Sequence, residues 1–211
     1  MINPIKIFKE YFSIINYAKQ QKKDLNIYPY KILLSYRIID HLFVSVEQLA
    51  SQILWIQNKL SNVVVKPKQV FSFWKILGNP AHISENSDSI LLYEIYSSII
   101  YHLALVSGLA ILERHPSSVD HFTKEQRIYP LGAEALVLYE SKDLKIKNNY
   151  DFPLKFNFEI KNQILNGSIL STEKIIRNEV VFTCRDFKKF KEVLTRINRR
   201  TTDVSVYKMK I

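Results

Sequence analysis

The stretch SILLYEIYSSIIYHLALVSGLAILE, residues 89–113, decides the fold that the sequence predicts. Apolar residues occupy most sides of a helix drawn over it, which is typical of a helix in the middle of a fold. Candidate N-caps in 86–89 place its start there, and we expect it to run to about Glu113. By their spacing, its polar residues share one face: Glu94, Ser97, Ser98 and Tyr101. This stripe either lines a ligand groove or is the exposed side of a mostly buried helix.

The chain before this stretch predicts further helices. Apolar residues recur at intervals of three and four between Leu42 and Leu60, which indicates a helix with one face on the core. Residues 4–17 read as a short amphipathic docking helix, and 28–39 as irregular or extended. The valine-rich segments 63–65 and 70–73, on either side of Pro67, read as two short strands joined by a turn.

After Pro130 the periodicity changes from helical to strand-like. The expected strands are 135–139, 144–147, 154–160 and 164–170, and the expected breaks are Asn148-Asn149, Lys161-Asn162 and a kink at Asn166-Gly167. Two more strands are expected at 179–183 and 204–210, around a short basic helix near Asp186 to Leu194. Helices followed by strands predict an α+β fold, with N-terminal helices and a central buried helix packed on an antiparallel sheet.

Composition points to an ordered, basic protein. The 211 residues are 47% hydrophobic and 12% aromatic, which is far from the composition of a disordered chain. The formal charge is +10, and from Arg185 onward nine Lys/Arg stand against three acids. The simpler reading is a solvated surface. The alternative is an anion-binding surface for nucleic acid or an anionic membrane, with these candidate residues: Lys188, Lys189, Arg199 and Arg200.

Residue types that bind metals or form disulfides are few. The single cysteine, Cys184, excludes a disulfide framework within the chain, and we expect it to be a small buried hydrophobe at a strand end. His115, Asp120 and His121 have no recognised metal-ligand spacing, so no metal and no cofactor are expected. Residues 1–24 contain no uninterrupted apolar run, and 90–112 is interrupted by polar residues. We therefore expect no signal peptide, no membrane span and a cytoplasmic location.

Two segments resemble a known family. Lys66-Pro67-Lys68-Gln69-Val70-Phe71-Ser72-Phe73-Trp74, followed by Gly78, is similar to the block that opens VanW-like domains, a family named for an accessory protein of vancomycin B-type resistance clusters. The second segment begins with Glu113-Arg114-His115 and keeps the spacing of a second family block through these residues: Ser118, Asp120, Phe122, Arg127, Pro130, Gly132, Ala135, Val137, Tyr139, Asp143, Leu144 and Asn148-Asn149. The resemblance as a whole covers roughly Asn58 to Ile169, about half of the chain.

The resemblance implies a layout and a departure from the family. It implies an N-terminal helical region at 1–57, a VanW-like α+β domain at 58–170, and a basic strand and helix extension at 171–211 packed on the same core. Family members carry Gly-Gly-x-Cys-Gln before the buried helix, an arrangement that looks like a papain- or transglutaminase-type Cys-His site and would imply that kind of fold. Here Glu94 falls where the cysteine would be, which removes the thiol.

Three functions stay open. The first is a non-catalytic binding or scaffolding relative, a pseudoenzyme, whose groove holds a peptide, a cell-wall fragment or a partner protein, with these groove candidates: Ser97, Tyr101, Arg114 and Arg127. The second is a hydrolase of amide or glycoside bonds with Glu94 as acid/base, His115 beside it and Asp120 or Arg127 as orienting groups. If the protein is instead a non-catalytic binding relative, His115 has a structural role. The third is nucleic-acid binding through the basic C-terminal segment.

Overall fold

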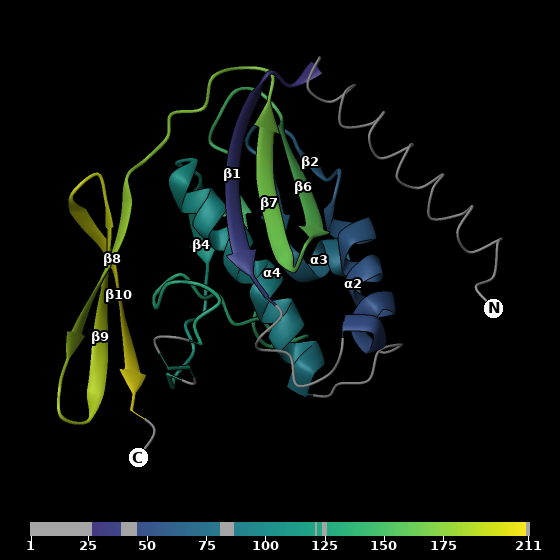
Figure 1. Ribbon diagram of the computed structural model, residues 1–211. Helices are drawn as coiled ribbons and strands as arrows, with labels where there is room; N and C mark the ends of the chain where they lie inside the picture. Colours follow the sequence, from purple (N-terminus) through teal and green to yellow (C-terminus); the bar gives the residue numbers. More distant parts are fainter. Residues whose placement is uncertain (1–26, 39–45, 81–86, 121, 124–125, 210–211) are drawn as a thin grey trace.

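The computed structural model describes residues 27–38, 46–80, 87–120, 122–123 and 126–209. Within them lie three helices and three antiparallel sheets (Figure 1), which confirms the α+β class. The expected docking helix at 4–17 lies outside the described residues. The papain- or transglutaminase-like arrangement stays a prediction.

The largest sheet joins strands from both halves of the chain. Its order is β1 (Tyr30–Arg37), β7 (Ile164–Ser171), β6 (Leu154–Lys161) and β2 (Val64–Val65). Strand β1 comes from the segment expected to be irregular or extended, and it pairs with β7 along its whole length. Strands β6 and β7 form a hairpin that turns at Asn162 and Gln163, both with positive φ.

The second sheet is small and brings the two family-like segments together. Its order is β3 (Val70–Ser72), β5 (Lys145–Lys147) and β4 (Ala110–Glu113). The two short strands expected on either side of Pro67 are present and are joined by a turn, and each pairs with a different strand, β2 with β6 and β3 with β5. Strand β3 leads directly into the short helix α3 (Phe73–Leu77), whose N-cap is Ser72.

The third sheet contains the C-terminal strands β10 (Arg200–Lys208), β9 (Phe190–Ile197) and β8 (Val180–Asp186). The basic helix expected near 186–194 is therefore wrong. Burial explains the error, because Val193, Leu194 and Thr195 are consecutive and all buried, so the middle of β9 is covered on both faces of the sheet. These tertiary contacts overrode the helical propensity of this lysine-rich segment.

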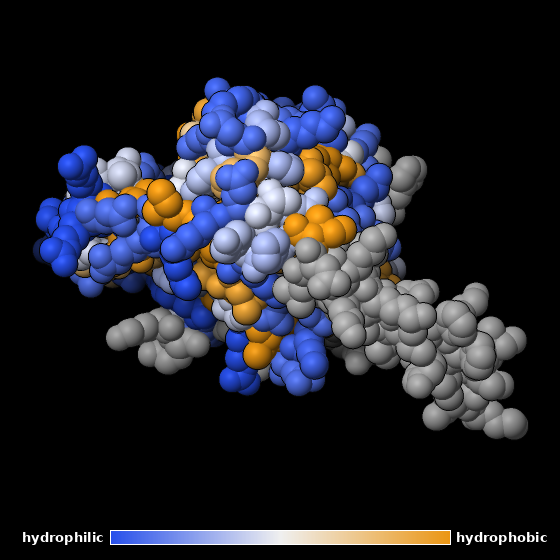
Figure 2. Space-filling view, turned by 90° about the horizontal axis from the view of Figure 1, so that it is seen from above, coloured by the Kyte–Doolittle hydropathy of each residue, from blue (hydrophilic) through white to orange (hydrophobic). Residues whose placement is uncertain are grey.

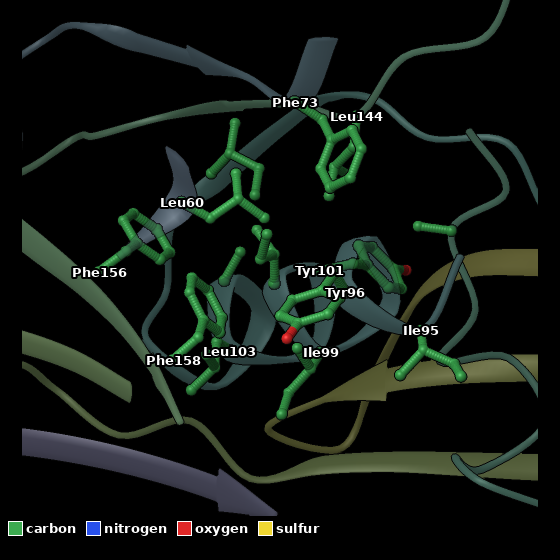
Figure 3. Packing of buried hydrophobic residues seen from close by; sticks show 14 of the residues in the cluster. Leu60, Phe73, Ile95, Tyr96, Ile99, Tyr101, Leu103, Leu144, Phe156 and Phe158 are labelled. Atoms are coloured by element: carbon green, nitrogen blue, oxygen red, sulfur yellow. The ribbon is translucent and has the colours of Figure 1, made fainter. Parts of the chain in front are cut away.

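Helix α4 (Ser87–Val106) lies at the centre of the core, as expected. Its Tyr96, Ile99 and Leu103 lie among side chains from α2 (Val46–Leu60), α3 and β6 (Figure 3). It ends earlier than predicted, because the N–H groups of Gly108 and Leu109 bond back to the carbonyls of Leu105 and Ala104, and the chain continues as β4.

Two further strand predictions need correction. Residues 135–139 do not form a strand. They pack over buried α4, and their one β-type pairing is an isolated bridge between Leu138 and Lys142. The expected kink at Asn166-Gly167 lies inside β7, where the strand is continuous. A Cβ on Gly167 would lie 2.9 Å from Ile99 Cδ1, so this glycine allows α4 to approach the sheet closely.

Helix α4 also has the composition of a membrane span. Among the described helices it is the one long and apolar enough to cross a membrane, over Ser89–Val106, and 78% of that window is buried inside the fold. A central core helix passes the same test of length and composition, so the finding is weak support for a span.

Gly132 determines how closely the third sheet packs. Its φ is +98°, and a Cβ there would lie 2.6 Å from Val193 Cγ1 and 2.9 Å from Phe182 Cδ1. Gly78 has a similar φ of +84° with no atom within 4 Å of the same position. The two glycines share the backbone requirement and differ in the space around them.

We predict that Gly132→Ala lowers the free energy of unfolding by about 2 to 5 kcal/mol, and Gly78→Ala by about 1 to 2 kcal/mol. Both variants place a side chain at positive φ, but only Gly132→Ala also forces the third sheet outward. Urea unfolding of the two variants measures the difference. Equal losses would show that the sheet does not rest on Gly132.

His102 of α4 is a partly buried, neutral histidine. Its Nδ1 lies 2.9 Å from the Tyr36 hydroxyl, and burial lowers its pKa from 6.5 to about 4. The unfolded chain therefore takes up a proton on His102 between about pH 6.5 and 4 while the folded chain does not. Its contribution to stability is present above pH 6.5 and is lost as the pH falls.

We predict that lowering the pH from 7.5 to 5 removes about 2 kcal/mol of stability through this residue. His102→Gln, which keeps a hydrogen-bonding group without titrating, should show a flatter profile over the same range. Urea midpoints at several pH values give both curves. Parallel curves for the two proteins would contradict the assignment.

Candidate functional site

A cleft of about 380 Å³ opens beside the first half of α4. Its other walls come from residues 117–134 and from Tyr207 of β10. The lining is mostly apolar with a few polar groups, as in many ligand sites: Ile90, Leu91, Glu94, Ser117, Val119, Asp120, Phe122, Arg127, Tyr129, Leu131, Glu134 and Tyr207. Three predicted site residues, Glu94, Asp120 and Arg127, are therefore brought to one cleft.

Glu94 is held in a fixed position in the cleft wall. Its Oε1 accepts hydrogen bonds from the Tyr129 hydroxyl at 2.9 Å and the Ser117 hydroxyl at 3.2 Å. Burial, followed by the charge of Glu94, raises the pKa of Tyr129 well above its usual value, so its hydroxyl stays protonated and donates. Sequence reasoning missed Tyr129 and Ser117, because only the fold brings residues 23 and 35 positions away to Glu94.

Asp120 and Arg127 form a closed ion pair at the edge of the cleft. Arg127 Nη2 donates to both carboxylate oxygens of Asp120 at 2.5 Å and to the Phe122 carbonyl at 3.1 Å. Lys191 of β9 also donates to Asp120, at 2.8 Å. Burial raises the pKa of Asp120, but Arg127 and Lys191 outweigh it and lower the pKa overall. Asp120 is therefore an ionised anchor for this loop and a poor acid.

A second buried ion pair contributes Glu134 to the wall of the cleft. Arg114 donates to Glu134 Oε1 at 3.1 Å, and the two side chains are 6% and 3% exposed. The remaining oxygen of Glu134 accepts from the Gly132 N–H at 2.8 Å, and Tyr207 donates its hydroxyl to Oε1. Burial raises the pKa of Glu134, and Arg114 acts against that shift.

His115 lies in a different cluster from the one that the hydrolase hypothesis requires. Its Nε2 lies 3.0 Å from Glu113, which also accepts from Lys145 at 2.6 Å and from the Asp143 N–H at 3.1 Å. Hydrogen bonds from Lys145 and His115 lower the pKa of Glu113 to about 2. His115 is not among the described residues that line the Glu94 cleft.

The four predicted groove residues do not lie in one groove. Arg127 lines the Glu94 cleft, whereas Tyr101 and Arg114 line a second cleft of about 530 Å³. Ser97 is fully buried and donates its hydroxyl to the Ala135 carbonyl. Ser98 and Tyr101 are also buried, so the polar stripe is not the exposed side of α4, and only Glu94 reaches the first cleft.

The four predicted anion-binding residues form two separate pairs. Lys188 and Lys189 lie in the turn between β8 and β9, and Arg199 and Arg200 lie where β9 turns into β10. All four are exposed. The eight residues of β9 separate the pairs by about 26 Å. The structure therefore does not bring them into one anion site.

Cys184 is exposed on β8, contrary to the expected buried position. Its thiol lies 3.7 Å from Asp186 Oδ1, and burial and the Asp186 charge raise its pKa. Of the other metal-site residues considered, His121 lies outside the described residues, and the described part of the chain contains no cluster of three His, Cys, Asp or Glu that would hold a metal ion.

The family-like residues mostly connect parts of the fold. Ser72 donates its hydroxyl to Asp143 Oδ2 at 2.6 Å, and Asp143 Oδ1 accepts from the Trp74 N–H at 3.1 Å. Asn148 Nδ2 donates to the carbonyls of Val65 at 3.0 Å and Phe152 at 2.9 Å. The first family-like segment thus bonds directly to the end of the second.

Comparison with known families agrees with the resemblance over part of the chain. A family model described as "VanW like protein" matches residues 95–170, a little over a third of the sequence. The match starts directly after Glu94 and includes the second family-like segment, and it leaves Lys66–Gly78 outside. Searches among curated proteins and solved structures gave no significant match. The resemblance to the VanW-like family is therefore confirmed for residues 95–170.

We predict that Asp120→Asn costs about 3 kcal/mol of stability, because it leaves Arg127 and Lys191 partly buried without their anion. Glu192→Gln is the matched control, since Glu192 pairs with the exposed Arg185 at 3.4 Å and an exposed pair contributes under about 1 kcal/mol. Urea unfolding compares the two. A loss in Asp120→Asn no larger than in the control would contradict an anchoring role.

Proposed function

We propose that this chain is a ligand-binding relative of VanW-like proteins and not a thiol enzyme, and that its Glu94 cleft holds a short peptide or cell-wall fragment by an amino group. The observation that carries the proposal is the carboxylate of Glu94, fixed by Tyr129 and Ser117 in the wall of a largely apolar cleft. A fixed carboxylate beside apolar surface complements an ammonium group at the end of an aliphatic chain.

The size and polarity of the cleft support binding of a small group. About 380 Å³ is within the range of small-molecule sites and accommodates one or two residues of a peptide. The apolar wall includes Leu91, Phe122 and Leu131. Asp120 already has two cationic partners, Arg127 and Lys191, and Glu134 has Arg114, so both carboxylates are occupied. The bonds described for Glu94 come from the hydroxyls of Tyr129 and Ser117, so we place the cationic group of the ligand beside Glu94.

The single cysteine of the chain, Cys184, is poorly placed for thiol chemistry in the Glu94 cleft. Cys184 lies on the third sheet, outside the lining of the Glu94 cleft, and its raised pKa disfavours the thiolate that would act as nucleophile. The resemblance assigns the family's cysteine to the position of Glu94, within the first half of α4, so a carboxylate stands there in place of the thiol. A carboxylate there suits recognition of a cation.

The two alternative functions have less support. A Glu94 hydrolase needs a second acid or base in the cleft with a pKa near the working pH, whereas Asp120 has a lowered pKa and His115 contacts Glu113. Nucleic-acid binding through the C-terminal segment would be favoured by one continuous basic surface, whereas the basic pairs Lys188-Lys189 and Arg199-Arg200 lie at opposite ends of β9.

The test is calorimetric titration with cell-wall stem peptides whose third residue carries a free side-chain amine, and with the same peptides acetylated on that amine. We expect micromolar binding of the free amine and at least about tenfold weaker binding after acetylation or in Glu94→Gln, the loss of one charge-assisted contact. Glu173→Gln, an exposed carboxylate outside the cleft, is the control and should bind as the parent does.

Mass spectrometry of the incubated peptides checks for turnover in the same samples. Intact peptides together with Glu94-dependent binding support the proposal. Affinity that is the same in Glu94→Gln, or peptide cleavage that disappears in that variant, would overturn it, the second in favour of the hydrolase.

A further inference from the structure

The second cleft lies between the edges of two sheets. Strand β4 is an edge of the sheet β3-β5-β4, and β10 is an edge of the sheet β10-β9-β8. Residues 111–113 of β4, the following Arg114 and residues 202–205 of β10 line the same cleft of about 530 Å³, together with Leu105 of α4 and Leu109 just after it. An edge strand is a template for a further strand when its backbone groups have no partner.

Backbone groups of β10 point into the space beside this edge. The Lys208 N–H donates to the Ser118 carbonyl at 2.9 Å, and the Lys208 carbonyl accepts from the Asp120 N–H at 3.3 Å. Both bonds lie on the side away from β9. Because strand backbone groups alternate in direction, those of Val206 and Val204 point the same way. No hydrogen bond joins these groups to any residue that the structure describes.

The chain already uses one end of this edge. Residues 118–120 lie parallel to the end of β10 and form the bridge Val119 with Lys208. From there the segment leading back to β4 and the strand β10 separate, and the cleft lies between them. The vacant length of the edge, residues 202–206, is about 17 Å. A strand entering the cleft would continue a ladder that residues 118–120 begin.

The chemistry around the edge suggests its occupant. Val204 and Val206 are 49% and 53% exposed, and apolar surface interrupts the hydrophilic surface of this side of the molecule (Figure 2, left). Arg199 and Arg200, directly before the vacant length, are exposed and make no ion pair with another described residue. With a net charge of +10, the chain favours an acidic partner over a second copy of itself.

We propose that the free edge of β10 binds an extended acidic segment of a partner protein, which adds as a strand in the cleft between β4 and β10. Backbone hydrogen bonds to Val204 and Val206 provide the affinity, as in other cases of strand addition. Apolar side chains of the segment pack on Leu112 and Val204 in the cleft. Its carboxylates meet Arg199 and Arg200 at the open end.

The test uses a display library of nine-residue segments with alternating aliphatic and random positions. The library is selected on the parent protein and, in parallel, on Val204→Pro, which removes an outward N–H that an edge strand can lose without unfolding. Cys184→Pro is the matched control on the other edge of the sheet. Cys184 stands opposite Val193, whose backbone groups face Ser205 of β10, so the Cys184 N–H points away from the ladder.

We expect enriched segments rich in Asp and Glu that bind Val204→Pro at least about tenfold more weakly and bind Cys184→Pro unchanged. Hydrogen exchange of the parent protein with the best segment should slow at the Val204 and Val206 amides, and this readout does not depend on any variant. No enrichment, equal binding to Val204→Pro, or unprotected amides at these two positions would overturn the proposal. A dimer in light scattering that Val204→Pro converts to monomer would also overturn it, in favour of a second copy.

Discussion

The ion pair of Arg114 and Glu134 is the interaction on which the rest of the arrangement depends. Arg114 donates to the carbonyls of Gly132 and Glu134 and to Asp203 and Ser205 of β10, and its guanidinium lies 5.0 Å from the centre of the Tyr101 ring. These contacts connect the end of β4, α4, the loop at 132–134 and the third sheet. A buried charge is costly unless every group is satisfied, and here both partners are. Arg114 lines the larger cleft and Glu134 the smaller one, so the pair forms the partition between the two candidate binding regions.

Extended backbone explains why two neighbouring residues, Arg114 and His115, have different roles. Successive side chains of an extended chain point to opposite sides. Arg114 therefore turns inward to Glu134, while His115 shares its side with Glu113, two positions before it, and contacts that carboxylate. Reading 113–115 as one unit at a helix end placed His115 beside α4. The helix ends at Val106 instead, and the following strand separates the imidazole from the Glu94 cleft.

The parts of the fold that the sequence predicts best are those with a strong local signal. The apolar stretch around Ile99 predicts a central helix, and the hairpin of β6 and β7 follows from the two strand-like segments on either side of Lys161-Asn162. The third sheet was only partly predicted, because its inward residues are recognisable as a buried face only after Gly132 and Glu134 have provided a surface to pack on. The site behaves in the same way. Glu94, Asp120 and Arg127 could be identified from the resemblance, whereas Tyr129 and Lys191 join them only through tertiary contacts.

The family-like residues hold the fold together, so the resemblance to the family concerns shape. Ser72, Asp143 and Asn148 join β3, α3 and the end of β5 by side-chain to backbone bonds and one direct bond between Ser72 and Asp143. Lys68 has φ of +61°, so a lysine adopts here the left-handed turn that glycine favours. Such residues stabilise the fold and do not determine its activity. Glu94 lies just before the matched segment and faces the cleft. The bonds of Ser72, Asp143 and Asn148 do not involve Glu94, so this frame can stay the same whichever residue occupies the position that the resemblance assigns to the cysteine.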